Sequence, residues 1–245
     1  MQGVEVRRSA DRFTTVAPAR TDEVAEGWTT TRHSFSFGEH YDPERVGFGP
    51  LQALNDETVR AGEGYPEHTH RDVEIVSWVL SGALAHSDSS YDDRSPVTIA
   101  PGNVQVLSAG SGVTHAEGAA DDASVHFVQT WVRPDEPGGT PDWAGGGVAD
   151  LRLAAEWVPV ASGSDPDALT ALRSRGTTLW VTRLTAGEGR TLPAAPSAYA
   201  FLARGSVDVD GVGLLDEGDA LQLTLPAPLL VTARSPAELL VWTFA

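Results

Sequence analysis

Two short stretches, Glu67-His68-Thr69-His70-Arg71 and Val113-Thr114-His115-Ala116-Glu117, decide the fold and the chemistry that this sequence predicts. Each stretch places two potential metal ligands at positions i and i+2, which aims both side chains at one face of a β-strand. The second stretch follows the first by about 45 residues. Three imidazoles and one carboxylate that converge from two strands of a small barrel would form a site for one divalent transition metal.

Two residues, Glu74 and Glu117, could supply the carboxylate ligand of this site. Beyond His70 the sequence alternates regularly as far as Glu74, so Glu74 would face the same way as the histidines if the strand continues. Glu117 has the same relation to His115. Parity therefore allows either glutamate to complete the site.

The composition excludes several kinds of chemistry. The 245 residues are 41% apolar, which is enough for one or two folded domains. The chain has no cysteine, so disulfides, thiolate metal sites, iron–sulfur clusters and thiol catalysis are excluded. All 17 basic residues are arginine, and the absence of lysine excludes Schiff-base chemistry and a P-loop lysine.

The charge and the hydropathy pattern limit the partners. A formal net charge of −17 opposes direct binding to nucleic acid, which requires clustered positive charge. No apolar run approaches the roughly 20 residues that a membrane-spanning helix needs, and residues 1–30 contain no apolar signal core. We expect a cytoplasmic protein with no membrane contact.

Short runs rich in valine, leucine, isoleucine, tryptophan and phenylalanine, separated by turn residues, predict an all-β sandwich or barrel. We expect strands at 73–80, 97–99, 104–107, 125–132, 151–160, 178–184, 198–202, 206–209, 220–225, 229–233 and 239–244. A short helix is expected at 165–174. Residues 134–147 are rich in proline and glycine and predict a linker without regular structure.

The linker divides the chain into two β-domains, expected at 1–137 and 151–245 with the connection at 138–150. All seven histidines, at positions 33, 40, 68, 70, 86, 115 and 126, precede the linker. Metal chemistry is therefore expected in the first domain only.

Other histidines offer weaker alternatives. His86 and Asp88 with His126 could imitate the two-histidine, one-carboxylate site of non-haem iron oxygenases, or they could simply end a hairpin. His33 and His40 either line a cleft or pack as ordinary structural residues.

Five segments together give the sequence a family resemblance. The segments are residues 28–42, 54–57, 68–74, 80–82 with 86–89, and 108–117. In these segments the chain resembles the cupin superfamily and, within it, the pirin family of bacterial pirin-like bicupins. The resemblance covers about residues 25–135 well, and it departs from the family pattern at Thr69, where proline is frequent.

The resemblance implies a bicupin fold, with two antiparallel β-barrels of the jelly-roll type that face each other and a metal in the first barrel. The implied ligands are His68, His70, His115 and Glu117, and the implied metal is iron(II). Glu74 would then be a hydrogen-bond partner that orients an imidazole. Manganese, nickel, cobalt, copper and zinc are alternatives, because this donor set does not fix the metal.

Two functions follow from the resemblance. The first is a quercetin 2,3-dioxygenase-type oxidoreductase that acts on a small flavonol-like aromatic substrate with dioxygen, with Glu117 as the residue that accepts the 3-hydroxyl proton. The alternative is a metal-containing regulatory protein that binds a protein partner and has no turnover of its own. In both cases we expect a monomer.

Overall fold

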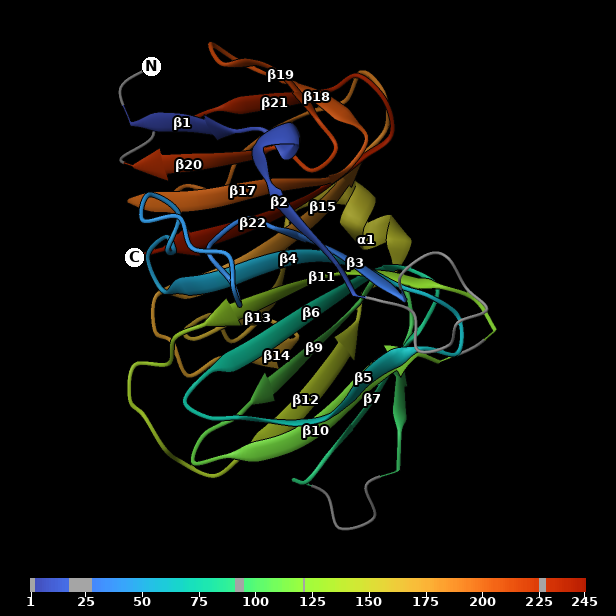
Figure 1. The fold of residues 1–245 in the computed structure, drawn as a ribbon. Helices are drawn as coiled ribbons and strands as arrows, with labels where there is room; N and C mark the ends of the chain where they lie inside the picture. Colours follow the sequence, from blue (N-terminus) through green and yellow to red (C-terminus); the bar gives the residue numbers. More distant parts are fainter. Residues whose placement is uncertain (1–2, 18–27, 91–94, 121, 225–227) are drawn as a thin grey trace. The chain divides into compact units, whose positions relative to one another are not determined.

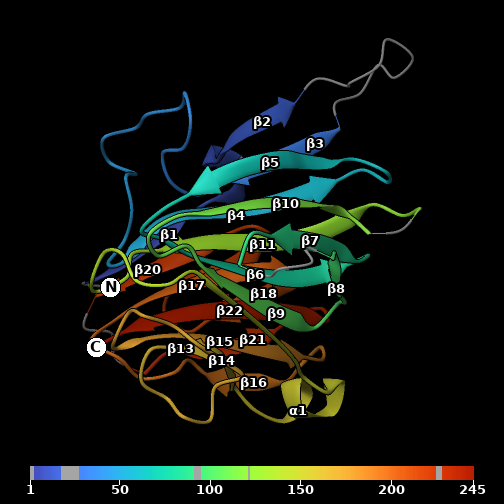
Figure 2. The same cartoon turned by 90° about the horizontal axis from the view of Figure 1, so that it is seen from below.

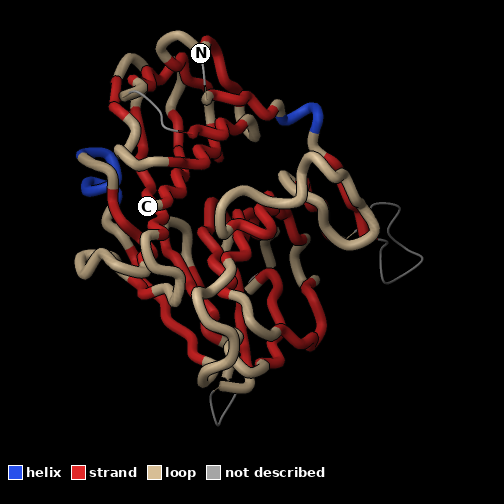
Figure 3. Tube along the Cα trace, turned by 90° about the vertical axis from the view of Figure 1, so that its left-hand side faces the viewer, coloured by secondary structure: helices blue, strands red, loops and turns tan. Residues whose placement is uncertain are grey.

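The structure is a computed structural model that describes residues 3–17, 28–90, 95–120, 122–224 and 228–245. The chain forms two compact units, an N-terminal unit of Arg12–Gly147 and a C-terminal unit of Met1–Asp11 with Val148–Ala245. Helix in the described residues is limited to η1 (Ser9–Asp11) and α1 (Asp150–Ala155), as Figure 3 shows. The predicted all-β class is confirmed. No helix in the described part of the chain is long and apolar enough to cross a membrane.

The N-terminal unit contains two antiparallel sheets (Figure 1). The larger has the order β12-β9-β6-β11-β4-β3-β2, and the smaller has the order β5-β10-β7-β8. The strands are β2 (Phe13–Ala17), β3 (Thr29–His33), β4 (Leu51–Val59), β5 (Gly64–His70), β6 (Glu74–Ser81), β7 (Leu84–Asp88), β8 (Val97–Ile99), β9 (Asn103–Ser108), β10 (Val113–Ala119), β11 (Val125–Val132) and β12 (Asp142–Gly147).

The core of the N-terminal unit lies between its two sheets. Val59, Val79 and Phe127 come from the larger sheet and pack with Leu84 and Ile99 of the smaller one. These β-branched, aliphatic and aromatic side chains are the residue types that a half-buried strand favours. The smaller sheet, whose strands β5, β10, β7 and β8 are labelled in Figure 2, carries both of the stretches that decide the chemistry.

The C-terminal unit repeats this plan with sheets β1-β20-β17-β22-β15-β13-β14 and β16-β21-β18-β19. Its interior is filled by aliphatic residues such as Leu202, Val207, Leu221 and Val241. The strands are β1 (Val4–Arg7), β13 (Val158–Ser162), β14 (Thr170–Ala171), β15 (Thr177–Leu184), β16 (Gly189–Thr191), β17 (Ser197–Arg204), β18 (Ser206–Val209), β19 (Gly213–Asp216), β20 (Ala220–Thr224), β21 (Leu230–Ala233) and β22 (Ala237–Phe244).

The first strand belongs to the C-terminal unit, although a boundary after residue 137 would place it in the first domain. β1 pairs antiparallel with β20, with Val4 opposite Leu223 and Val6 opposite Leu221. Val4 and Val6 pack against the aliphatic core of that unit. Burial of these two side chains explains why the chain start joins a sheet that is completed more than 200 residues later.

The segment expected to be an irregular linker contains a strand. β12 pairs with β9 from Asp142 opposite Ser108 to Gly147 opposite Asn103. A Cβ atom on Gly145 would lie 2.8 Å from the Trp143 ring, so glycine lets the indole fold over its own strand. The proline- and glycine-rich composition predicted a linker, but in β12 a glycine makes room for the Trp143 side chain within a strand.

Two further expectations are wrong in the C-terminal unit. Residues 165–174 form turns and the short strand β14. The helix lies instead at Asp150–Ala155 and replaces the first half of the expected strand 151–160, of which only residues 158–160 are strand, in β13. α1 has only six residues, and Arg152 and Glu156 form an ion pair one turn apart at 2.7 Å. Such a short amphipathic turn leaves no periodicity long enough to be recognised from sequence.

Candidate metal centre

The pairing of β5 with β10 brings the predicted histidines together. His68 lies opposite His115, and His70 lies opposite Val113. Each of His68, His70 and His115 offers a ligand atom within 4.8 Å of the others. The i, i+2 spacing of both stretches thus produces a cluster of three imidazoles on one face of the smaller sheet.

His68 and His115 have the spacing of neighbouring ligands to one ion. Their Nε2 atoms are 3.0 Å apart. Two nitrogens that each lie about 2.0–2.1 Å from a single metal are separated by about 3 Å when their bonds are nearly perpendicular. Nδ1 of His68 lies 2.8 Å from the Pro66 carbonyl oxygen, which can only accept, so Nδ1 carries the proton and leaves Nε2 free to bind.

An irregularity in the pairing gives His68 this carbonyl partner. The register of β5 against β10 shifts between His115, opposite His68, and Glu117, opposite Tyr65. Two residues of β5, Pro66 and Glu67, therefore oppose one residue of β10, which is the arrangement of a β-bulge. Proline is tolerated at such a position, where no ladder hydrogen bond is required from its nitrogen.

Glu117 is buried behind the histidine cluster and holds hydrogen bonds at both carboxylate oxygens. Its Oε1 accepts a bond of 2.5 Å from Gln105 Nε2, and its Oε2 accepts a bond of 2.8 Å from Gln129 Nε2. Both glutamines come from the larger sheet, on β9 and β11. Glu117, on the smaller sheet, is therefore fixed by the sheet that faces it across the core.

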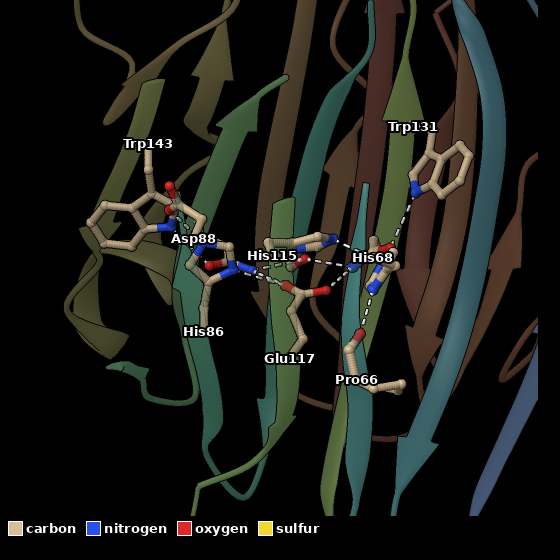
Figure 4. Close-up of polar contacts among 11 residues, drawn as sticks. Pro66, His68, His86, Asp88, His115, Glu117, Trp131 and Trp143 are labelled. Atoms are coloured by element: carbon tan, nitrogen blue, oxygen red, sulfur yellow. Dashed lines mark hydrogen bonds and ion pairs between the residues drawn. The ribbon is translucent and has the colours of Figure 1, made fainter. Parts of the chain in front are cut away.

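Two tryptophans fix the orientation of these glutamines. Figure 4 shows the two indoles, Trp143 and Trp131, on opposite sides of Glu117. Trp143 Nε1 donates to Gln105 Oε1 at 3.0 Å, and Trp131 Nε1 donates to Gln129 Oε1 at 3.1 Å. An indole nitrogen can only donate, so each amide must present its oxygen to the indole and its NH2 group to Glu117. We call this arrangement of Trp143, Gln105, Gln129 and Trp131 the glutamine frame.

His86 approaches Glu117 from β7. Its Nδ1 lies 3.4 Å from Glu117 Oε1, and its Nε2 lies 2.9 Å from Asp88 Oδ2. Burial opposes the protonated form of His86, but the two carboxylates outweigh it and raise the pKa of His86. His86, His115 and Glu117 form a second group of donor atoms within 4.8 Å of one another, and it shares His115 with the first.

The ionisation states of the cluster suit metal binding. Burial, reinforced by the neighbouring histidines, lowers the pKa of His70 and of His115 to about 4, so both imidazoles are neutral at pH 7. Burial opposes ionisation of Glu117, but His86, His115 and Gln129 outweigh it and lower its pKa to about 2. Neutral imidazoles and an ionised carboxylate are the forms that bind a cation.

Glu74 lies apart from both donor groups. Asp72 adopts a left-handed conformation with φ of 56°, and this turn separates β5 from β6. Glu74 therefore begins a strand of the larger sheet, where its Oε2 accepts a hydrogen bond of 2.8 Å from Ser108. The expected alternation from His68 to Glu74 is broken at the turn, and the two carboxylates that shared the right parity lie in different sheets.

The other histidines have separate places. His126 Nε2 lies 2.6 Å from Asp56 Oδ1, so the triad imagined for His86, Asp88 and His126 is not assembled. Thr69 directs its hydroxyl to that of Thr114, 3.3 Å away on the exposed side of the sheet. The departure from the family pattern at Thr69 therefore lies on the side of the strand away from the histidine cluster.

A cavity of about 670 Å³ opens beside the cluster, and all its lining residues belong to the N-terminal unit. His68, His70 and Glu117 line it together with His33 and His40, so these two histidines are cleft residues. Aromatic rings follow one another along its wall. The ring centroids of His33 and Phe37 are 5.2 Å apart, those of Phe37 and Trp131 are 5.1 Å apart, and those of Trp131 and His70 are 4.9 Å apart.

Sequence reasoning missed the glutamine frame and the position of His86. The only signal for His86 was its i+2 relation to Asp88 in a strand-like run. Gln105 and Gln129 sit in apolar runs, where a single polar residue at a core position was the one available sign. Their meeting at Glu117 depends on register, which one sequence does not reveal.

The donor set fits a divalent transition metal. Three imidazoles and a carboxylate suit iron, manganese, nickel, cobalt, copper and zinc alike. His115 Nδ1 is buried without a hydrogen-bond partner among the described residues. The oriented Nε2 atom of His68 and the held carboxylate of Glu117 match the second-sphere support that metal ligands usually have.

Comparison with known proteins finds relatives of both β-domains of this chain. The Pirin family profile matches residues 15–132, and the profile described as quercetinase C-terminal cupin domain matches residues 160–243. A Mycobacterium tuberculosis protein named "Putative quercetin 2,3-dioxygenase" is 40% identical over 242 residues, which are 98% of this chain and 94% of its own length. A "Pirin-like protein" of Caulobacter vibrioides is 36% identical over 88% of this chain and 92% of its own.

Solved structures share the fold. The bacterial pirin YhhW of Escherichia coli, crystallised in complex with nickel(II), superposes with a TM-score of 0.85 at 26% identity and covers 98% of both chains. A quercetin 2,3-dioxygenase of Acinetobacter baumannii superposes with a TM-score of 0.71 at 20% identity and covers 98% of this chain and 85% of its own. The dioxygenase name of the Mycobacterium tuberculosis relative supports the expected oxidoreductase class. By its sequence and its two-domain cupin fold, this chain belongs to the pirin family.

Proposed function

We propose that this protein is a metal-dependent dioxygenase that opens the heterocycle of flavonols, as a quercetin 2,3-dioxygenase does. His68, His70, His115 and Glu117 would hold one divalent metal, with iron(II) as the first choice. The observation that carries the proposal is that His68, His70 and Glu117 line one cavity of about 670 Å³ walled by aromatic rings, while His115 belongs to the donor groups of both the histidines and Glu117. A flat aromatic substrate fits such a wall, because stacked and edge-on ring contacts stabilise it.

A divalent metal held by these residues would acidify an enolic hydroxyl of the substrate and activate dioxygen beside it. Glu117 is ionised at neutral pH and lines the cavity, so it can accept the 3-hydroxyl proton. A pKa of about 2 makes Glu117 a weak base, and proton transfer to it therefore requires a hydroxyl that is itself acidic. The glutamine frame keeps both oxygens of Glu117 hydrogen-bonded while this carboxylate accepts the proton.

Substitution at the two glutamates tests the site. Glu117→Gln removes the charge and the proton acceptor, and we expect loss of at least about 100-fold in turnover with the fold retained. Glu74→Gln is the matched control, because it removes a buried carboxylate of the same unit that lies outside both donor groups, and it should leave turnover within about twofold. Full activity of Glu117→Gln, or loss only in Glu74→Gln, would contradict the assignment.

Oxygen uptake tests the reaction. Protein purified without added metal is analysed for its metal content, stripped, and reconstituted with each of the six candidate metals in turn. We expect oxygen consumption and carbon monoxide release with quercetin for at least one metal. A fully loaded protein that consumes no oxygen, and that retains a stable protein partner, would instead support the regulatory alternative.

A further inference from the structure

A second polar group lies in the cavity wall, apart from the metal cluster. Tyr65 on β5 donates a hydrogen bond of 2.6 Å from its hydroxyl to Oε2 of Glu57 on β4. Both side chains line the same cavity as His68, His70 and Glu117. The Tyr65 ring centroid lies 6.4 Å from that of His68, so one small aromatic molecule can reach both polar points.

Burial of Glu57 costs folding free energy, which is unusual for a residue with a purely structural role. It is only 4% exposed, and among the described residues it forms no ion pair. Burial raises the pKa of Glu57 to about 7, and the charge of Glu117 adds to this. A buried carboxyl group without a cation destabilises the fold, and such groups are concentrated at functional sites.

The surroundings of the pair are hydroxyl-rich. The Tyr65 hydroxyl oxygen lies 3.2 Å from Thr29 Oγ1 and 3.4 Å from Thr31 Oγ1, both on β3. Glu57, Tyr65 and the two threonines thus present a cluster of oxygen acceptors and rotatable donors at one place in a mostly aromatic wall. A ligand hydroxyl, which both donates and accepts, can join such a cluster.

We propose that Glu57 and Tyr65 form a hydroxyl-recognition subsite, which binds a ring hydroxyl of a polyhydroxylated aromatic ligand whose other oxygen lies at the histidine cluster. The choice of a flavonol as that ligand rests on the function proposed above. The subsite selects ligands because a molecule without the hydroxyl would leave buried polar groups without partners. The aromatic wall supplies affinity for any flat ring, and the subsite supplies the preference for hydroxylated ones.

Equilibrium binding measures this preference without turnover. Zinc-loaded protein is titrated with quercetin and with 3-hydroxyflavone, which keeps the 3-hydroxyl and the 4-keto group but lacks every other hydroxyl, and quenching of tryptophan fluorescence gives each Kd. We expect wild-type protein to bind quercetin about tenfold more tightly, as one hydrogen bond to a buried polar group allows. In Glu57→Gln and in Tyr65→Phe the ratio should fall below about threefold, with 3-hydroxyflavone affinity unchanged.

Glu39→Gln is the matched control, since Glu39 is an exposed carboxylate that lines the same cavity. It should keep the wild-type ratio, and unchanged 3-hydroxyflavone binding shows that each variant has folded. Equal binding of both compounds by wild type, or a tenfold ratio retained in both subsite variants, would overturn the subsite. Oxygen uptake is measured separately, so a protein that shows the preference but consumes no oxygen refutes the dioxygenase and leaves the subsite standing.

Discussion

Glu117 accepts hydrogen bonds from two glutamines whose amide orientation is set by Trp131 and Trp143. Both glutamine NH2 groups also lie 3.3 Å from the hydroxyl of Ser77, which stands between them on β6. A buried polar network of this kind is stable only when each member finds its partners. The carboxylate is thus held by two glutamines that belong to neither donor group.

Removal of one indole N–H tests the glutamine frame. Trp131→Phe keeps an aromatic ring beside His70 and Phe37 but frees the Gln129 amide to turn its oxygen toward Glu117. We expect the affinity for cobalt(II) to fall by about tenfold or more, the usual effect of losing a group that orients a ligand, with altered visible absorption of the bound metal. Competition with a chelating dye measures the affinity.

Trp157→Phe is the control for that experiment. Trp157 donates its indole N–H to the Thr191 carbonyl oxygen in the C-terminal unit. Trp157→Phe therefore also removes one indole hydrogen bond, but in the unit that does not contain the histidine cluster. An equal loss of cobalt affinity in both variants would show that the frame has no specific role.

The pH dependence of stability tests the burial of Glu57. Its pKa rises from 4.5 to about 7 on folding, so between these pH values the folded protein binds a proton that the unfolded chain releases. Stability from this group therefore falls as pH rises through that window. Glu57→Gln lacks this penalty. In urea unfolding of metal-free protein, the difference in unfolding free energy between Glu57→Gln and wild type should therefore shift in favour of the variant by up to about 3 kcal/mol from pH 4 to pH 8. A difference that does not change with pH would refute the assignment.

At the scale of elements, the pairing of β5 with β10 does most to build the site. Gly64 lies opposite Gly118 next to Glu117, and a Cβ atom on Gly64 would lie 2.5 Å from the Glu117 carbonyl oxygen and 2.7 Å from Gly118 Cα. The two strands can approach closely here only because neither residue has a side chain. The same pair of strands sets the distance between His68 and His115.

Gly64→Ala tests this close approach. The added methyl group must push β5 away from β10, and we expect a loss of about 1–3 kcal/mol in unfolding free energy together with weaker metal binding. Gly189→Ala in β16 is the control, because its nearest neighbour would be a Leu230 side-chain atom at 3.3 Å that can move. Chemical denaturation and metal titration of both variants decide the point, and equal effects would count against the proposed role of the glycine pair.

Elements also share a row of polar residues across the larger sheet. His33, Asn55, Gln129, Ser77 and Gln105 lie opposite one another on β3, β4, β11, β6 and β9 in turn. Residues directly opposite in neighbouring strands point to the same face. Side chains from five separate strands therefore form one polar band that lines the cavity at one end and holds Glu117 at the other.

At the scale of the whole molecule, the two units share a strand plan but not a chemistry. The donor groups found in the described residues all belong to the N-terminal unit. Residues 148–245 contain no histidine and no cysteine, and the interior of their barrel is aliphatic. The second sheet pair therefore offers no imidazole or thiolate to a transition metal.

Metal stoichiometry tests this asymmetry. Elemental analysis of the reconstituted protein should give about one metal ion per chain, because the described residues contain one cluster of three imidazoles. His68→Ala should abolish this binding, whereas a substitution of the half-buried His40, which belongs to neither donor group, should not change the count. Two ions per chain in wild type, or one retained in His68→Ala, would contradict the predicted ligand set.

Local rules made much of this structure predictable. The all-β class, most strand positions and the shared face of His68 with His70 follow from a side-chain period of two, which a single strand dictates. The confinement of histidine to residues 33–126 needs no structure at all. Failures occurred where glycine-rich β12 and the six-residue α1 lacked a periodic pattern.

Sequence by itself thus determined the fold class, the two pairs of candidate ligands and the unit that contains them, because each depends on neighbours along one strand. Only the tertiary structure decided that β1 completes the second unit, that the turn at Asp72 sends Glu74 to the other sheet, and that two glutamines meet at Glu117. It also joined Glu57 to Tyr65 in the cavity wall. These features depend on strand register and on packing between sheets, which balance contributions from distant segments and leave no local pattern in the sequence.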